Sequence, residues 1–269
     1  MLRSIFVASY FFSMTPLLIA AQWAFARLRL PGRGTIAVVY YKALCRVLGL
    51  RVRVIGVPIT EHPVLMVSNH QSWADILALG SITSVAFVSK REVRDWPIVG
   101  ISAELLHTVF VDRTRRHQTG AAIADMVERL AARIPVVLFA EGTSSDGNRV
   151  LPFRSALIGA LRDACAHADI GDRVMIQPVS ICYTSVQGLP MGRQHRPVVA
   201  WYGDLDLTPH LKTFLERGAV DVVVTFGEPI PADGSSDRKN VTRMLEMTVR
   251  RLTAATLRSR AVPAAQPAE

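Results

Sequence analysis

For its 269 residues, the sequence has few cysteines, few lysines and few charged residues. Cys45, Cys165 and Cys182 are its only cysteines. They lie far apart and form no Cys-x-x-Cys pair, which argues against a disulfide framework or a zinc site and favours a reducing compartment. Charged residues make up 20% of the chain, the mean hydropathy is +0.26, and glycine and proline show no low-complexity excess. These values exclude a disordered or collagen-like chain.

Positive charge is in clear excess. The chain carries 31 Lys+Arg against 22 Asp+Glu, a formal net charge of +9, and all but four of the basic residues are arginines. The excess points to nucleic acid, a membrane surface or an acidic substrate as partner, although an arginine-rich codon bias would also produce it. No run of five like charges and no aromatic–basic stripe supports nucleic-acid binding, so we expect no nucleic-acid partner.

A long uncharged segment lies near the N-terminus. The 23 residues Ser4–Ala26, between Arg3 and Arg27, would form a helix of about 34 Å, enough to cross a bilayer core of about 30 Å. Pro16 would kink this helix, so a bent helix within one leaflet is an alternative to a full span. The segment predicts attachment to a membrane.

A cleaved signal peptide is the competing interpretation of this segment, because residues 24–26 fit a small-x-small cleavage site. Trp23 and Phe25 are bulky for such a site, however. The arginines at positions 27, 29 and 33 outweigh the one at position 3, which favours a retained anchor with the following domain in the cytoplasm. We therefore expect the protein at the cytoplasmic face of the inner membrane.

The next stretch, Thr35–Leu50, is apolar except for Lys42 and Arg46, which share one face of a helix. An interfacial membrane helix and a helix that packs on the core both explain this pattern. We assign residues 1–50 to a membrane-anchoring helical segment.

From residue 51 onward, short β-branched runs alternate with longer amphipathic stretches. This alternation predicts an α/β fold with a mostly parallel central sheet flanked by helices over residues 51–260, followed by a disordered tail at 261–269. The expected strands are Arg51–Ile55, Val64–Val67, Val85–Val88, Thr108–Val111, Pro135–Phe139, Val174–Pro178, Val198–Trp201 and Asp221–Phe226. The expected helices are Trp73–Leu79, Trp96–Leu105, Thr114–Ala132, Arg154–Ala166, Thr208–Arg217 and Asp237–Ser259.

A histidine and an aspartate five residues apart could act together as a general base and the group that orients it, because a carboxylate on one ring nitrogen leaves the other free to take a proton. The chain has three pairs in the order His-x4-Asp, and only one lies where a strand turns into a helix and can fold back on itself. The same turn also fits a capping box formed by Ser72 and Asp75, and the two roles are compatible. The three pairs are His70/Asp75, His107/Asp112 and His167/Asp172.

A second candidate loop, 139–147, follows the expected strand Pro135–Phe139. Its small residues leave backbone N–H groups open to an anion, and Glu141 could hold the loop or contact substrate hydroxyls, although a plain turn explains the pattern equally well. Lys90 and Arg113 end two other expected strands, where lone basic residues are usually solvated. Because the carboxyl ends of parallel strands meet at one edge, His70, Arg113 and Glu141 could converge there.

These blocks resemble the glycerolipid acyltransferase family, the PlsC-like 1-acylglycerol-3-phosphate acyltransferases. The resemblance spans roughly residues 60–185 and rests on four blocks in order. They are Asn69-His70-x4-Asp75, Phe110-Val111-Asp112-Arg113, Phe139-Ala140-Glu141-Gly142-Thr143 and the strand that ends Gln177-Pro178-Val179-Ser180.

The resemblance implies a membrane-bound enzyme that transfers an acyl group from acyl-CoA or acyl-carrier protein to the hydroxyl of a lysolipid, with no metal or other cofactor. His70 would be the general base and Asp75 would orient it, without an acyl-enzyme. Arg113 would bind the anionic head of the acceptor. The residues expected to bind substrate are Asn69, Lys90, Arg113, Glu141, Gly142, Thr143 and Arg154.

Departures from the family pattern bear on the acceptor. Ala140 stands where the family often has proline, and Ser144 where it often has arginine, although Arg154 could compensate for the lost cation. The run Glu141–Arg149 is similar to a branch that acts in ornithine-lipid synthesis, whose lyso-ornithine lipid acceptor carries a carboxylate and an amine in place of phosphate. Lyso-ornithine lipid is thus the alternative to lysophosphatidic acid. A lipid-binding membrane protein without catalysis is the main alternative from another class.

Overall fold

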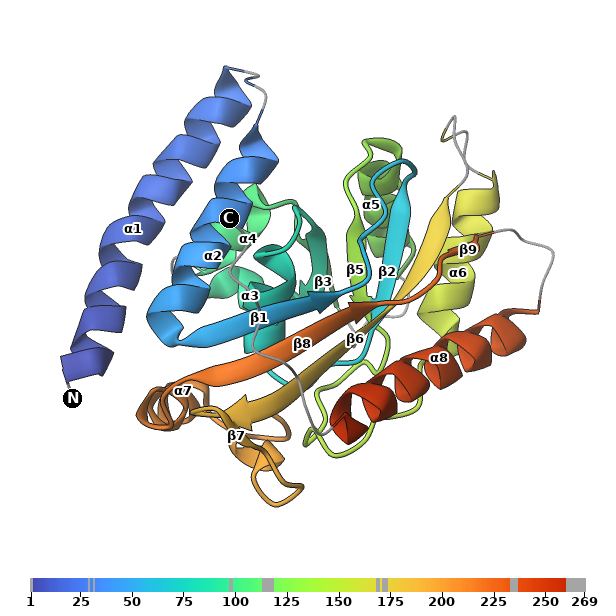
Figure 1. The fold of residues 1–269 in the computed structure, drawn as a ribbon. Coiled ribbons are helices and arrows are strands. Elements are labelled where there is room, and N and C mark those ends of the chain that lie inside the picture. Colours follow the sequence, from blue (N-terminus) through green and yellow to red (C-terminus); the bar gives the residue numbers. More distant parts are fainter. Residues whose placement is uncertain are drawn as a thin grey trace.

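The chain begins with two helices that lie side by side and run in opposite directions (Figure 1). The computed structural model describes residues 2–28, 30, 32–96, 99–112, 119–167, 170, 174–232 and 237–259. Helix α1 (Leu2–Arg27) is continuous through Pro16 and packs along α2 (Arg33–Leu48). Within the described residues, Ile5–Phe25 is the one segment long and apolar enough to cross a membrane. Helix α1 also contacts two helices of the α/β domain, α4 (Val99–Leu105) and α7 (Leu207–Glu216).

Helix α2 covers the predicted stretch Thr35–Leu50 as far as Leu48, while Leu50 begins β1; the helix packs against α3 (Ala74–Gly80) and β1. Leu44, Cys45 and Leu48 are buried on one side of the helix, while Lys42 and Arg46 are exposed on the other. The structure therefore supports the core-packing interpretation of this helix.

The central sheet follows the order β1-β8-β6-β2-β5-β3-β4, and two short strands, β7 and β9, pair with β6. All neighbours along this path are parallel except β6 and β8, which are antiparallel. The strands are β1 (Leu50–Ile55), β2 (Val64–Ser68), β3 (Ala86–Lys90), β4 (Val109–Val111), β5 (Val136–Phe139), β6 (Met175–Val186), β7 (Leu189–Pro190), β8 (Val220–Phe226) and β9 (Ile230–Pro231). The predicted mostly parallel sheet is confirmed.

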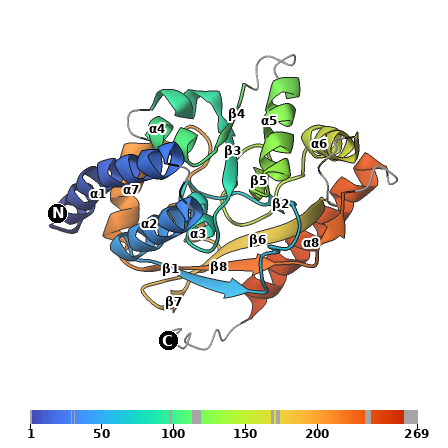
Figure 2. The same ribbon diagram turned by 90° about the horizontal axis from the view of Figure 1, so that it is seen from above.

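Helices cover both faces of this sheet (Figure 2). Because successive residues of β2 point to opposite faces, Leu65 and Val67 pack in one buried cluster with residues of α5 (Thr119–Ala131), α6 (Ser155–His167) and α8 (Arg238–Arg258). Val64 and Met66 pack in the other cluster, with residues of α2, α3 and α7. Strand β2 is thus buried on both sides, as expected for the centre of an α/β sheet.

One predicted strand is wrong. Residues 198–201 form no strand; a short 3₁₀ helix, Arg196–Val198, and a turn lie there. Pro197 has no amide hydrogen for a sheet ladder, and the backbone N–H of Trp201 donates to the carbonyl of Gln71 at 2.8 Å. The β-branched run Val198–Val199 therefore packs as part of a buried loop.

Strand β6 is longer than predicted. It continues past Pro178 to Val186, and this extension pairs with β8. The other expected strands and helices are present with shifted ends; a further 3₁₀ helix, Arg91–Asp95, follows β3. The tail at 261–269 and the N-terminal end of the expected helix Thr114–Ala132 lie outside the described residues.

Candidate active site

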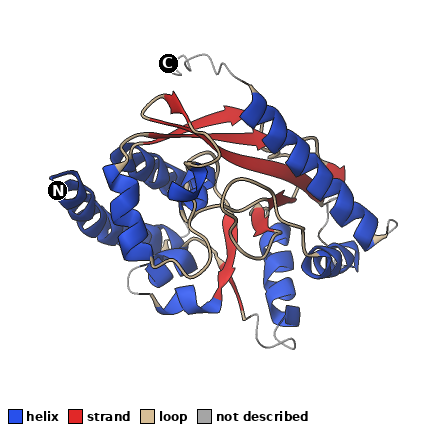
Figure 3. Cartoon of the chain, turned by 90° about the horizontal axis from the view of Figure 1, so that it is seen from below, coloured by secondary structure: helices blue, strands red, loops and turns tan. Residues whose placement is uncertain are grey.

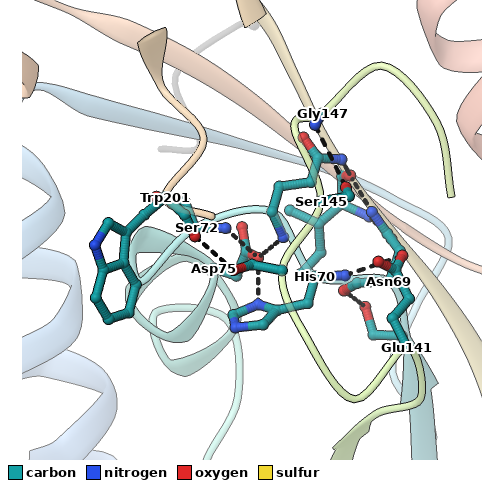
Figure 4. Close-up of polar contacts among 12 residues, drawn as sticks. Asn69, His70, Ser72, Asp75, Glu141, Ser145, Gly147 and Trp201 are labelled. Atoms are coloured by element: carbon teal, nitrogen blue, oxygen red, sulfur yellow. Dashed lines mark hydrogen bonds and ion pairs between the residues drawn. The ribbon is translucent and has the colours of Figure 1, made fainter. Parts of the chain in front are cut away.

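The loop that joins β2 to α3 carries His70, and Asp75 lies in the first turn of α3 (Figure 4). Strand β2 lies in the middle of the sheet, so its carboxyl end is surrounded by the loops of neighbouring strands, which gather between the helical layers when the molecule is seen from below (Figure 3). Asn69 anchors the loop to β6: its side-chain amide donates to the carbonyl of Ile181 at 2.9 Å, and its Oδ1 accepts the Ile181 N–H at 2.9 Å. Both the strand and the anchor hold His70 at this edge.

His70 and Asp75 are in direct contact. The Nδ1 of His70 lies 2.8 Å from the Oδ2 of Asp75, and the carboxylate is fully buried. A carboxylate that accepts a hydrogen bond from Nδ1–H selects the tautomer in which Nε2 carries the lone pair. About 19% of the His70 side chain is exposed, and Nε2 has no hydrogen-bond partner among the described residues. The pair therefore has the geometry of a general base and its orienting group.

Asp75 is also part of the helix start. Its Oδ2 accepts the backbone N–H groups of Gln71 at 2.7 Å and Ser72 at 3.0 Å. The backbone N–H of Asp75 donates to the carbonyl of Ser72 at 3.0 Å and not to its Oγ, so only the carboxylate half of the predicted capping box forms. The same carboxylate thus organises the loop and orients the imidazole.

Tyr183, which the sequence did not indicate, completes the hydrogen bonds of Asp75. Its hydroxyl donates to the Oδ1 of Asp75 at 2.7 Å from strand β6. Burial raises the pKa of the Tyr183 phenol well above its usual range, and the neighbouring Asp75 carboxylate adds to the shift. The phenol therefore remains a neutral donor at physiological pH.

Phe139 supports the face of the imidazole. The rings of His70 and Phe139 stack with centroids 4.0 Å apart and planes 18° from parallel, and Phe87 stacks on Phe139 in turn. Asp75 fixes the edge of the histidine ring and Phe139 fixes its plane. Together they hold Nε2 in one direction.

Glu141 lies inside the protein beneath the same loop. The residue is 2% exposed, and its Oε1 accepts the backbone N–H of His70 at 3.4 Å. Burial raises the pKa of the Glu141 carboxyl to about 8, although the N–H of His70 opposes this shift. This position fits the loop-holding role that was one of the two predicted for Glu141.

The other residues expected to bind substrate do not all lie next to the His70–Asp75 pair. Gly142 has a φ of +70° and sits so close to Arg154 that a Cβ would lie 2.6 Å from its Nε, which itself donates to the carbonyl of Glu141 at 3.2 Å. Thr143 is exposed beside them. Lys90 is exposed at the end of β3, separated from β2 by β5. Arg113 lies outside the described residues.

Comparison with known proteins identifies the family. Residues 51–182 match the Acyltransferase family. The chain is 43% identical over 264 residues to the lyso-ornithine lipid O-acyltransferase of Brucella abortus, covering 98% of both chains. It is 30% identical over 202 residues to the 1-acyl-sn-glycerol-3-phosphate acyltransferase of Neisseria gonorrhoeae, covering 74% of each. The chain belongs to the acyltransferase family.

The fold agrees with this assignment. The crystal structure of the 1-acyl-sn-glycerophosphate (LPA) acyltransferase PlsC from Thermotoga maritima superimposes with a TM-score of 0.68 at 22% identity, over 97% of this chain and 96% of that one. The family resemblance drawn from four short blocks is confirmed, and the chain is an acyltransferase enzyme. In this acyltransferase, the histidine–aspartate pair of the first block is assembled at the centre of the sheet.

Proposed function

We propose that this acyltransferase esterifies the free hydroxyl of a lysolipid at the membrane, and that lyso-ornithine lipid is its preferred acceptor. The proposal is carried by the full-length similarity to the Brucella abortus enzyme, which includes the N-terminal helices as well as the α/β domain. The assembled pair of His70 and Asp75 favours catalysis over a lipid-binding protein without activity. The exposed apolar side chains on α1 support work at a membrane.

His70 supplies the base for this reaction. Its Nε2 takes the proton of the acceptor hydroxyl as the oxygen attacks the carbonyl carbon of the acyl thioester. The new C–O bond forms, the C–S bond breaks, and the proton passes from the imidazolium to the departing thiolate, which gives an ester and a thiol. Asp75 stabilises the imidazolium that exists between the two transfers. The thioester is the only co-substrate, and the scheme calls on no cofactor or metal.

The loop after β5 bears on which head group the acceptor carries. Ser144 occupies the position at which the glycerophosphate enzymes often carry arginine, and its Oγ donates to the carbonyl of Trp201 at 2.5 Å. Ser144 thus hydrogen-bonds to the backbone of a neighbouring loop, and its side chain carries no positive charge that could bind a phosphate. An acceptor with a carboxylate and an amine fits the changed loop better than one with a phosphate dianion.

1-Acyl-glycerol-3-phosphate is the second candidate acceptor. The Neisseria gonorrhoeae relative acts on it by name, and Arg154 places an exposed guanidinium next to Glu141 that could meet a phosphate. Lys90, Arg113 and Thr143 would serve either head group in this proposal. We further propose that the α/β domain lies on the cytoplasmic side of the inner membrane, as the arginines flanking α1 favour.

A paired-acceptor assay tests this proposal. Full-length enzyme in detergent micelles receives one acyl thioester and either lyso-ornithine lipid or lysophosphatidic acid, and thiol release and the lipid product are both measured. We expect a higher kcat/KM with lyso-ornithine lipid and loss of both products in His70→Ala. A preference for lysophosphatidic acid would replace the first acceptor with the second.

The same distinction can be made in cells. In a deletion strain, lipid mass spectrometry should show loss of ornithine lipid while phosphatidic acid synthesis continues. Return of ornithine lipid with the wild-type gene, and its continued absence with the His70→Ala gene, would separate catalysis from the mere presence of the protein. The reverse pattern of lipids would favour lysophosphatidic acid.

A further inference from the structure

Helix α8 concentrates positive charge. Among its residues Arg238–Arg258, the only acidic one is Glu246, against six basic residues. The proposed reaction does not use the charge of this helix. The whole chain has a formal net charge of +9. The helix therefore accounts for much of an excess that the catalytic chemistry leaves unexplained.

Four of these six basic residues lie on one exposed face. Val241, Leu245 and Val249 are buried in the core on the inner side of α8. Exposed residues recur at helical spacing on the opposite side, with Met247 near the middle of that face. This α8 basic face consists of Arg243, Met244, Met247, Arg250, Arg251 and Arg258.

The two methionines lie within the α8 basic face. Met244 is 45% exposed and Met247 is 63% exposed, and both are apolar side chains surrounded by arginines. Methionine and arginine are enriched where proteins bind other proteins, because a flexible apolar side chain adapts to a partner and a guanidinium pairs with its carboxylates. The composition of this face fits an acidic protein partner.

A membrane surface fits this face less well. The exposed aromatic side chains that suit a lipid interface are on α1, where Phe6, Phe12 and Trp23 are each about 60% exposed. Helix α8 exposes no aromatic residue. It also lies on the other side of the sheet region from α1 in both views (Figures 1 and 2).

The α8 basic face is joined to the catalytic loops through Glu246. The carboxylate of Glu246 accepts the backbone N–H of Phe153 at 2.9 Å, at the end of the loop that begins with Glu141. The other oxygen of Glu246 pairs with Arg250 at 2.9 Å. A partner docked on this face would thus sit beside the loop that continues to the buried Glu141 and the His70 backbone.

We propose that the α8 basic face is the docking surface for an acidic acyl-carrier protein that delivers the acyl thioester. This inference rests on the proposed acyl transfer and names its donor. An exposed helix face can bind another protein, whereas a nucleotide such as coenzyme A is usually held in a concave pocket. Opposite charges on the two proteins would speed their encounter and orient the carrier toward the catalytic loop.

Direct binding separates this proposal from the proposed function, because it needs no acceptor. Full-length enzyme in neutral detergent micelles is titrated with acyl-carrier protein, and the double variant Arg243→Glu, Arg251→Glu is compared with the wild type. We expect the Kd of the variant to rise on the order of tenfold or more, and the wild-type Kd to rise with salt. The control is Lys212→Glu, Arg217→Glu on the region of α7, which reverses two exposed charges elsewhere and should leave the Kd unchanged.

Two further readouts decide what the face contacts. In the transfer assay, the α8 variant should show a raised KM for the acyl-carrier thioester and an unchanged KM for the lysolipid. An unchanged Kd for the carrier would overturn the docking proposal even if acyl transfer to lyso-ornithine lipid is observed. The docking proposal would also be overturned if the α8 variant lost binding to anionic phosphatidylglycerol vesicles but still bound the carrier protein. That result would assign the α8 basic face to the membrane.

Discussion

The hydroxyl of Tyr183 donates a 2.7 Å hydrogen bond to Asp75 from a strand 108 residues further along the chain. The other carboxylate oxygen of Asp75 already serves His70 and two backbone N–H groups. Tyr183 therefore restrains rotation of the carboxylate and holds the oxygen that faces the histidine. We regard Tyr183 as a positioning residue, because it acts on the reaction through Asp75.

Replacement of Tyr183 by phenylalanine should lower kcat about tenfold and leave both KM values unchanged, because the buried Oδ1 of Asp75 loses its donor while the ring still fills its site. Steady-state kinetics with varied acceptor and donor measure the change. Tyr40→Phe is the matched control: it removes a phenolic hydroxyl that bonds Thr15 on α1, away from the catalytic loop. An equal loss of kcat in both variants would contradict the positioning role of Tyr183.

Replacement of Asp75 by asparagine should lower kcat by about 10²- to 10⁴-fold, because an amide can present its NH₂ group to Nδ1 and so favour the wrong histidine tautomer. Two backbone N–H groups would also lose a charged acceptor, so the melting temperature should fall by a few degrees. Activity and thermal unfolding are measured on the same preparation. A variant that melts earlier yet keeps its kcat would show that Asp75 acts only as a helix cap.

Replacement of Glu141 by glutamine should flatten the pH dependence of stability. Burial raises the pKa of Glu141 from 4.5 to about 8, so the unfolded chain releases this proton more readily than the folded one. The stabilisation that Glu141 provides is complete below pH 4.5 and is lost as the pH rises toward 8. Glutamine cannot ionise, so the variant should lack this loss.

Urea unfolding at several pH values between 5 and 9 measures the effect. The difference in free energy of unfolding between Glu141→Gln and the wild type should grow in favour of the variant as the pH rises. A difference that stays constant across this range would mean that Glu141 is ionised in the folded protein.

The three cysteines should be inert in the native enzyme. Cys45, Cys165 and Cys182 are buried free thiols, and burial raises the pKa of each to about 11. Because the thiolate is the reactive form, an aromatic disulfide reagent at neutral pH should label the native chain slowly and the unfolded chain at all three positions. Rapid labelling of the folded enzyme would show that at least one of these sites opens to solvent.

The amino-acid sequence alone determined the order of strands and helices over most of the α/β domain, because hydrophobic periodicity is a local property. It also located the histidine–aspartate pair, since a five-residue separation at a turn from strand to helix needs no information from elsewhere in the chain. The four short blocks then determined the family. The mistaken strand at 198–201 came from the same local reasoning, because β-branched residues are equally suited to a buried loop.

Only the tertiary structure decided which distant residues support the site. Tyr183 contacts Asp75, and Asn69 bonds to Ile181, because β6 pairs with β2 in one particular register. The local sequence of either strand does not determine that register. The stack of Phe139 on His70 depends in the same way on β5 lying next to β2. Burial of Glu141 and exposure of the α8 basic face likewise follow from packing. Local sequence sets the chemistry of each residue, and packing between distant segments sets its neighbours.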